Sequence, residues 1–151
     1  MIRVAIVEDD SRCISHLREM FERYGREKGL EFRFSQFCSG VDFVSDYTAD
    51  YDLVCMDIDM PHLNGLEAAR ELRKHDERVF LVFVTNLARY AIKGYEVDAS
   101  EFIVKPVEYK TFCAKIERVI ERIRQGEEPF LVVDSRDGKT KVLYSDIFYI
   151  T

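Results

Sequence analysis

Short apolar runs alternate along this chain with stretches in which apolar residues recur every three or four positions. Runs of the first kind indicate strands that are buried on both faces, and spacing of the second kind indicates one face of a helix. The predicted strands are 2–7, 30–37, 53–56, 79–84 and 101–104. The first predicted helix carries Ile14, Leu17, Phe21 and Tyr24 on one face, with Asp10 or Ser11 to cap its start and Gly29 just past its end. The other predicted helices are 40–47, 66–74, 88–95 and 109–124.

This alternation of strands and helices predicts an α/β fold with a parallel sheet and helices on both of its faces. Crossovers between parallel strands are right-handed, so few topologies remain, and the flavodoxin-like order 2-1-3-4-5 is the common one for five strands. We therefore predict a doubly wound (βα)5 domain over residues 1–124. Ligands of such sheets bind outside the carboxyl ends of the strands.

The residues after this domain follow a different pattern. Residues 125–129 are polar and predict a linker, and the apolar runs 130–133 and 141–144 flank Asp137-Gly138, which is a hairpin signal. A further element begins at residue 145. Because an isolated hairpin is marginally stable in water, we expect residues 130–151 to be the incomplete start of another domain.

Composition limits the possible partners. The chain has 151 residues, 47% apolar and 33% charged, as soluble globular proteins do. No apolar run approaches the roughly 18 residues of a membrane span, and the first ten residues do not resemble a signal peptide. We therefore expect a cytoplasmic protein with no membrane partner. The net charge of −6 argues against a free-standing nucleic-acid binder, and the widely spaced cysteines argue against zinc and for reduced thiols.

Polar residues follow four of the predicted strands. Glu8 and Asp9 follow the first strand, Asp57 the third, Thr85 the fourth and Lys105 the fifth. Carboxylates brought together repel each other and need a counter-charge, which Mg²⁺ with oxygen ligands supplies. The lysine adds a second positive charge, and the threonine hydroxyl is a donor for an oxyanion. These residue types predict a site that handles phosphoryl groups.

An aspartate can act as the nucleophile in such a site and form an acyl phosphate. Asp57 is the predicted nucleophile because it directly follows the most enclosed central strand. Asp9 is the predicted direct metal ligand, Glu8 a ligand through water, and Asp59 a ligand through its backbone carbonyl. Transfer of the phosphoryl group then needs little beyond positioning and charge neutralisation.

Four motifs in this order resemble the receiver domain of bacterial two-component response regulators. They are Val7–Asp10, Asp57–Pro61 with Gly65, Val84–Asn86 and Phe102–Pro106. The stretch 89–100 is similar to the LytTR-type (LytR/AgrA-like) subgroup, in which a receiver precedes a β-rich DNA-binding domain. Residues 130–150 resemble the opening strands of such a domain.

The resemblance implies that Asp57 accepts a phosphoryl group from the phosphohistidine of a sensor histidine kinase. It implies that Asp9, Asp57 and the Asp59 carbonyl hold Mg²⁺ and that Lys105 pairs with the phosphoryl group. Thr85 would hydrogen-bond the phosphoryl group, and Phe102 would rotate as Thr85 moves.

The resemblance also implies an output face at 88–124 and a homodimer on activation. It implies promoter DNA binding only through a complete C-terminal domain. Such a protein is not an enzyme, since it promotes only its own phosphorylation and dephosphorylation.

Three alternatives remain open at this point. A haloacid-dehalogenase-like phosphatase shares the Asp-x-Asp pattern of Asp57 and Asp59, although its Asp-x-Asp strand comes first in the chain. A flavin-binding flavodoxin shares the layout, but the acids after the first strand would repel phosphate. A receiver-like module could bind partners without being phosphorylated. For single residues, Thr85 could be a plain helix N-cap and Phe102 plain core.

Overall fold

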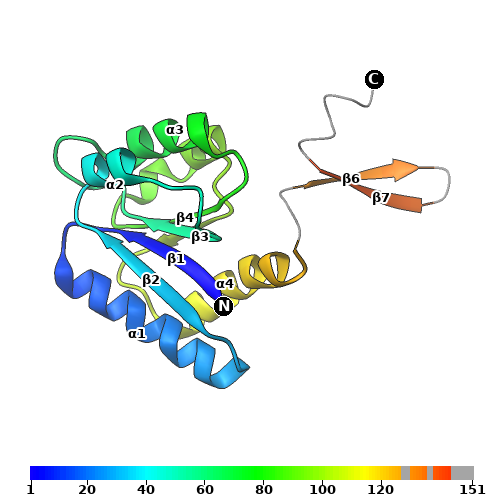
Figure 1. Ribbon diagram of the computed structural model, residues 1–151, viewed down its shortest axis with the longest axis horizontal. Helices are drawn as coiled ribbons and strands as arrows, with labels where there is room; N and C mark the ends of the chain where they lie inside the picture. The colour runs from blue at the N-terminus through cyan, green and yellow to red at the C-terminus, as the bar shows by residue number, and fades with distance from the viewer. Residues whose placement is uncertain (127–129, 136–137, 144–151) are drawn as a thin grey trace.

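A computed structural model describes residues 1–126, 130–135 and 138–143. Its main sheet has five parallel strands in the order β2-β1-β3-β4-β5 (Figure 1), which confirms the predicted flavodoxin-like topology. The strands are β1 (Ile2–Val7), β2 (Phe32–Phe37), β3 (Leu53–Met56), β4 (Phe80–Thr85) and β5 (Glu101–Val104). The central strands β3 and β4 are buried along their whole length, because helices cover both faces of the sheet.

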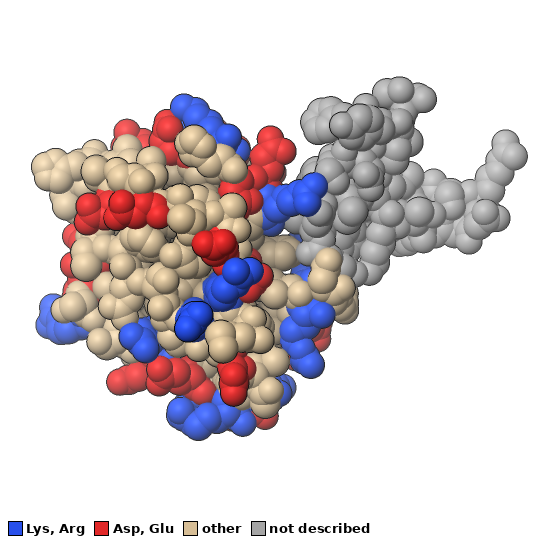
Figure 2. Space-filling view, in the orientation of Figure 1, with Lys and Arg blue, Asp and Glu red and all other residues tan. Residues whose placement is uncertain are grey.

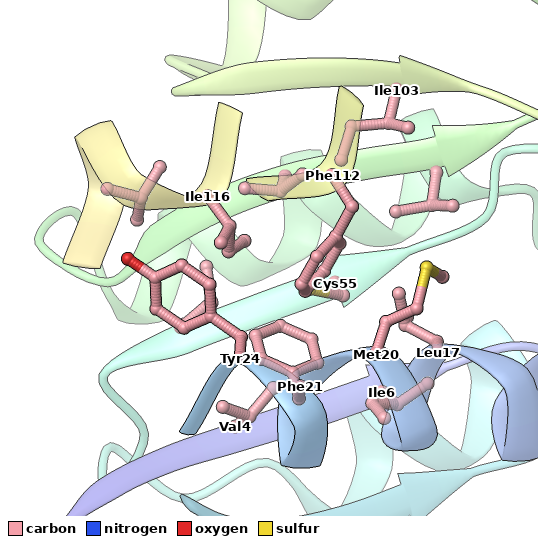
Figure 3. Packing of buried hydrophobic residues seen from close by; sticks show 14 of the residues in the cluster. Val4, Ile6, Leu17, Met20, Phe21, Tyr24, Cys55, Ile103, Phe112 and Ile116 are labelled. Carbon is pink, nitrogen blue, oxygen red and sulfur yellow. The ribbon is translucent and has the colours of Figure 1, made fainter. Parts of the chain in front are cut away.

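Helices form a layer on each face of the sheet (Figure 1). One layer holds α1 (Ser11–Lys28) and α4 (Tyr109–Arg124), and the other holds α2 (Gly40–Asp46) and α3 (Gly65–His75). Each layer encloses its own apolar cluster. Figure 3 shows the first cluster, in which side chains of α1 and α4 meet over the sheet. The side chains labelled there from these helices are Leu17, Met20, Phe21, Tyr24, Phe112 and Ile116.

The ends of α1 follow the sequence signals. The Asp10 side chain accepts a hydrogen bond from the Arg12 backbone N–H, which caps the start of the helix. Gly29 closes the helix in the left-handed conformation at φ 69°, where glycine carries no Cβ penalty. The Leu30 N–H then bonds to the Gly25 carbonyl. Because the chain still closes the helix at this point, β2 begins at Phe32, two residues later than predicted.

The segment after β4 differs from its prediction. Residues 88–95 are predicted as one short helix, but the chain forms two 3-10 helices, η1 (Ala88–Tyr90) and η2 (Ile92–Val97). Apolar spacing of three or four fits both helix types over so short a stretch. Neither piece has a side-chain hydrogen bond at its N-cap. The prediction of one continuous helix is therefore wrong here, although the position of the segment is right.

The predicted hairpin is present as β6 (Phe130–Ser135) and β7 (Gly138–Leu143), which pair antiparallel. Asp137 of the predicted turn, Tyr144 and the predicted element from residue 145 lie outside the described residues. The assignment of residues 125–129 to a linker and of 130–151 to a further domain remains a prediction.

Charged side chains of both signs are interspersed over the face of the molecule in Figure 2. This mixture agrees with the modest net charge of −6. Within the part of the chain that the structure describes, no helix combines the length and the apolar character that crossing a membrane requires.

Candidate functional site

The carboxyl ends of β1, β3 and β5 bring three of the predicted site residues into direct contact. Lys105 Nζ donates to Glu8 Oε2 at 2.7 Å and to Asp57 Oδ2 at 3.0 Å. Glu8 and Asp57 are only 5% and 4% exposed. The strand order explains this convergence, since β1 and β3 are neighbours and their carboxyl ends share one edge of the sheet.

Asp9 completes an acidic cluster with these two residues. One carboxylate oxygen each from Glu8, Asp9 and Asp57 lies within 4.8 Å of the others, and Asp9 is the exposed member. Asp59 is also exposed, and its N–H donates to Asp57 Oδ1 at 3.0 Å. A set of hard oxygen donors beside solvent suits a divalent cation such as Mg²⁺, which keeps several of its waters.

Burial and charge shape the electrostatics of the cluster. Burial raises the pKa of Glu8 to about 7, and the nearby Asp57 charge adds to this effect while Lys105 opposes it. Burial alone would lower the pKa of Lys105, but its hydrogen bonds to Glu8 and Asp57 raise that pKa above its usual value. The ammonium therefore stays charged, and the raised pKa of Glu8 reflects chiefly the removal of its carboxyl from water.

Thr85 is fully buried at the end of β4. Its Oγ1 accepts the Leu87 N–H at 3.2 Å, and its carbonyl accepts the Lys105 N–H at 2.9 Å. Thr85 therefore links the start of the 88–97 segment to the loop that carries Lys105. It does not cap η1, whose N-cap is Leu87.

Phe102 is half-buried on β5. Its ring lies against Phe83 with the centroids 6.1 Å apart. The switch role of Phe102 stays a prediction, as do the other predicted roles.

Gly65 fixes the start of α3 against the backbone of Asp57. A Cβ at this position would lie 2.2 Å from the Asp57 carbonyl oxygen and 2.7 Å from Ile58 Cα. The Gly65 N–H also bonds to the Ile58 carbonyl at 3.0 Å. Only glycine permits this close approach, so Gly65 helps to hold the loop that carries Asp57.

The contact of Cys13 with Lys105 was not predicted from the sequence. Its Sγ lies 3.6 Å from Lys105 Nζ, and burial raises the pKa of the thiol. Cys13 lies in the first turn of α1, three residues after Asp10, and this nearness to the Glu8-Asp9-Asp10 run was the only signal in the sequence. With Asp57 and Lys105 it lines a pocket of about 470 Å³ beside the acidic cluster. All four cysteines are free.

The comparisons with known proteins agree with this geometry. The model of the response regulator receiver domain family matches residues 4–117. Transcriptional regulatory protein NatR of Bacillus subtilis is 26% identical over 122 residues, which are 81% of this chain and 51% of NatR. Sensory transduction protein LytR of Staphylococcus saprophyticus is 30% identical over 79 residues, 52% of this chain and 31% of LytR.

Solved structures share the fold. The BeF3-activated receiver domain of DrrB from Thermotoga maritima superposes with a TM-score of 0.68 at 25% identity, and the match covers 81% of this chain and 99% of that domain. The chain spans about half the length of the curated relatives that match it first. The family model, the strand order and the acidic cluster agree, and the chain belongs to the response regulator receiver domain family.

Proposed function

We propose that Asp57 is the phosphoacceptor of this receiver domain and that a sensor histidine kinase supplies the phosphoryl group. The observation that carries the proposal is the contact of Asp57 with Lys105 beside Glu8 and Asp9. A carboxylate oxygen of Asp57 forms the new bond to phosphorus while the phosphorus–nitrogen bond of the phosphohistidine breaks. The electron pair of that bond stays on the imidazole.

Lys105 and Thr85 stabilise the phosphorylated state in this proposal. The Lys105 ammonium already touches Asp57 Oδ2 and would pair with the phosphoryl oxygens. Phosphorylation adds nearly two negative charges, which favour the conformation in which the Thr85 hydroxyl turns inward to donate. Phe102 then changes its rotamer as Thr85 moves. This change shifts the equilibrium between the inactive and active conformations of the output face.

The donor set of the cluster fits Mg²⁺. Asp9 and Asp57 would hold it through their carboxylates, Glu8 through water and Asp59 through its backbone carbonyl. When bound, Mg²⁺ supplies the positive charge that the carboxylates lack and a contact for phosphoryl oxygens. Positioning of Asp57 and Lys105 remains the work of the strand ends and of Gly65.

The output face lies at 88–124 in this proposal and mediates a homodimer on activation. Ile92 and Tyr95 are 79% and 80% exposed on η2, which supports a partner surface there. The stretch 89–100 and the partial match to LytR support the LytTR-type subgroup. Promoter DNA would be bound only through a complete C-terminal domain that residues 130–151 begin.

Beryllofluoride, an analogue of the phosphoryl group, tests the proposal. With Mg²⁺ it should raise the melting temperature of the unsubstituted chain and of an Asp46→Asn control on α2. Asp57→Asn should abolish the rise. An equal rise in Asp57→Asn would refute the assignment of the phosphoacceptor.

A second variant tests the division of roles. Lys105→Ala should keep Mg²⁺ binding, because the three carboxylates remain, but should lose the response to beryllofluoride. Loss of Mg²⁺ affinity in Lys105→Ala would contradict the role given to Lys105. Sustained turnover of p-nitrophenyl phosphate would instead favour the phosphatase alternative.

A further inference from the structure

The loop that joins β5 to α4 carries Lys105, and its own hydrogen bonds hold it mainly at its two ends. At the first end, the Lys105 N–H bonds to the Thr85 carbonyl at 2.9 Å. At the other end, Glu108 is the N-cap of α4, and its side chain makes no capping hydrogen bond. Between them, Val107 packs half-buried against the first apolar cluster. The middle of the loop therefore depends on contacts with another element.

Two side chains of α1 reach this loop. His16 Nε2 lies 3.3 Å from the Val107 carbonyl oxygen, and because a carbonyl can only accept, the ring nitrogen is the donor. Cys13 Sγ lies 3.6 Å from Lys105 Nζ. Cys13 and His16 are three residues apart on α1, a spacing that puts them on one face of the helix. One face of α1 thus contacts both the Lys105 side chain and the backbone two residues beyond it.

A cavity lies between α1 and the loop. Its volume is about 470 Å³, and Cys13, His16, Lys105 and Val107 all line it. Groups that face a cavity lack the close contacts on that side that fix packed side chains. The two polar contacts across this gap therefore have a larger share in setting the distance between α1 and the loop than they would have in a packed interface.

The contacts of Lys105 are sensitive to that distance. Its ammonium donates to Glu8 Oε2 at 2.7 Å and to Asp57 Oδ2 at 3.0 Å, and the side chain is only 14% exposed. Hydrogen bonds weaken steeply when the donor leaves its normal distance and angle. A shift of the loop relative to α1 therefore changes the contact between Lys105 and Asp57.

We propose that His16 is a positioning residue for Lys105. Its hydrogen bond to the Val107 carbonyl holds the loop at the distance from α1 at which the ammonium meets Asp57, and Cys13 Sγ contacts the ammonium from the side of α1. His16 acts on the phosphoryl group only through Lys105. The role rests on the proposed function, because it affects phosphorylation only if Asp57 is the phosphoacceptor and Lys105 pairs with the phosphoryl group.

The affinity of the whole chain for beryllofluoride in the presence of Mg²⁺ tests the proposal. His16→Leu removes the donor and should weaken beryllofluoride about fivefold, as expected for one hydrogen bond of ordinary strength. Mg²⁺ alone should bind with unchanged affinity, because the carboxylates remain. His16→Gln should restore most of the affinity for beryllofluoride, since its amide nitrogen is also a donor. His75→Leu makes the same substitution at an exposed position of α3 outside the cavity and should leave both affinities unchanged.

Three results would overturn the role of His16. They are full affinity for beryllofluoride in His16→Leu, no recovery in His16→Gln, and an equal loss of Mg²⁺ and beryllofluoride affinity, which would indicate a general distortion of the site. The outcomes also separate this role from the proposed function. If Asp57→Asn still responds to beryllofluoride, the proposed function fails and the role of His16 fails with it. If Asp57→Asn loses the response while His16→Leu keeps full affinity, only the role of His16 fails.

Discussion

The two segments that follow β3 and β4 begin beside site residues, but they are built in different ways. α3 begins at Gly65, beside Asp57, and the Asn64 and Glu67 side chains form a capping box at its start. The 88–97 segment begins three residues after Thr85 and forms only η1 and η2, without side-chain caps. Local sequence signals therefore suffice for α3 and do not suffice for the 88–97 segment.

Hydrogen bonds from another helix, α3, hold the end of the 88–97 segment instead. Arg73 of α3 donates to the carbonyls of Val97 and Asp98 at 2.8 and 3.1 Å. The same guanidinium donates to the carbonyls of Asp76 and Val79, and burial lowers its pKa without removing its charge. The C-terminal end of the segment is thus fixed to α3, and Leu87, which directly precedes the segment, is bonded to Thr85. A segment with little structure of its own, tied to a site residue, is a suitable element for relaying a change at the site.

The largest expected effect is the loss of stability in Gly65→Ala, and the same substitution at Gly94 in the 88–97 segment is its comparison. Gly65→Ala would place a Cβ against the Asp57 backbone and should lower the free energy of unfolding by about 3 kcal/mol or more. Gly94→Ala in η2 meets nothing closer than 3.5 Å and should change it by less than about 1 kcal/mol. Urea unfolding measures both. Similar losses in the two variants would remove the difference between the segments.

Removal of the Arg73 guanidinium, which bonds the end of the 88–97 segment to α3, should have the next largest effect. Arg73→Met leaves four carbonyls without this donor and should cost about 2–4 kcal/mol. Arg70→Met, on the same helix, removes only the exposed pair with Glu96 and should cost less than about 1 kcal/mol. Hydrogen exchange should rise in 92–98 for Arg73→Met alone. Unchanged hydrogen exchange in 92–98 would show that Arg73 does not hold the segment.

The pH dependence of the free energy of unfolding tests the charged site independently of α3 and of the 88–97 segment. The folded chain keeps the Glu8 proton to about pH 7, whereas the unfolded chain releases it near 4.5, the ordinary pKa of a glutamate. The folded state then binds more protons between these values, so the free energy of unfolding should fall as pH rises from about 5 to about 7, by on the order of 2 kcal/mol in Mg²⁺-free buffer. Glu8→Gln should remove this slope and Arg73→Met should keep it. A slope that persists in Glu8→Gln and is lost in Arg73→Met would show that Glu8 is not the group responsible for the pH dependence.

The smallest expected effect tests the local signal of α3. Asn64→Ala should lower the free energy of unfolding by about 1 kcal/mol, because the Glu67 N–H loses its side-chain acceptor. Asn64→Asp should restore most of that loss, since aspartate caps equally well. No loss in Asn64→Ala would mean that packing, and not capping, fixes the start of α3.

Sequence patterns predicted most of the fold because the signals that carry it are local. Continuous apolar runs such as Leu53–Met56 identified central strands, and Asp10 and Gly29 identified the ends of α1. The division of the 88–97 segment into two 3-10 helices escaped prediction because apolar spacing over so short a stretch fits both helix types. The late start of β2 escaped for a different reason, since a backbone hydrogen bond at the end of α1 decides it.

The candidate site was predicted to a similar extent. Strand ends place Glu8, Asp57 and Lys105 together, so the alternation of elements was enough to bring these residues together. The contact of Cys13 with Lys105 and the pocket behind it depend on how α1 packs over the sheet. No spacing along the chain reports that packing, because the residues concerned are far apart in sequence.

The most direct test of the account is to treat the chain with acetyl phosphate and Mg²⁺ and to measure its mass before and after proteolysis. The account predicts a gain of a single phosphoryl group per chain, located at Asp57, and no gain in Asp57→Asn. A stable gain at another residue, or an undiminished gain in Asp57→Asn, would contradict it.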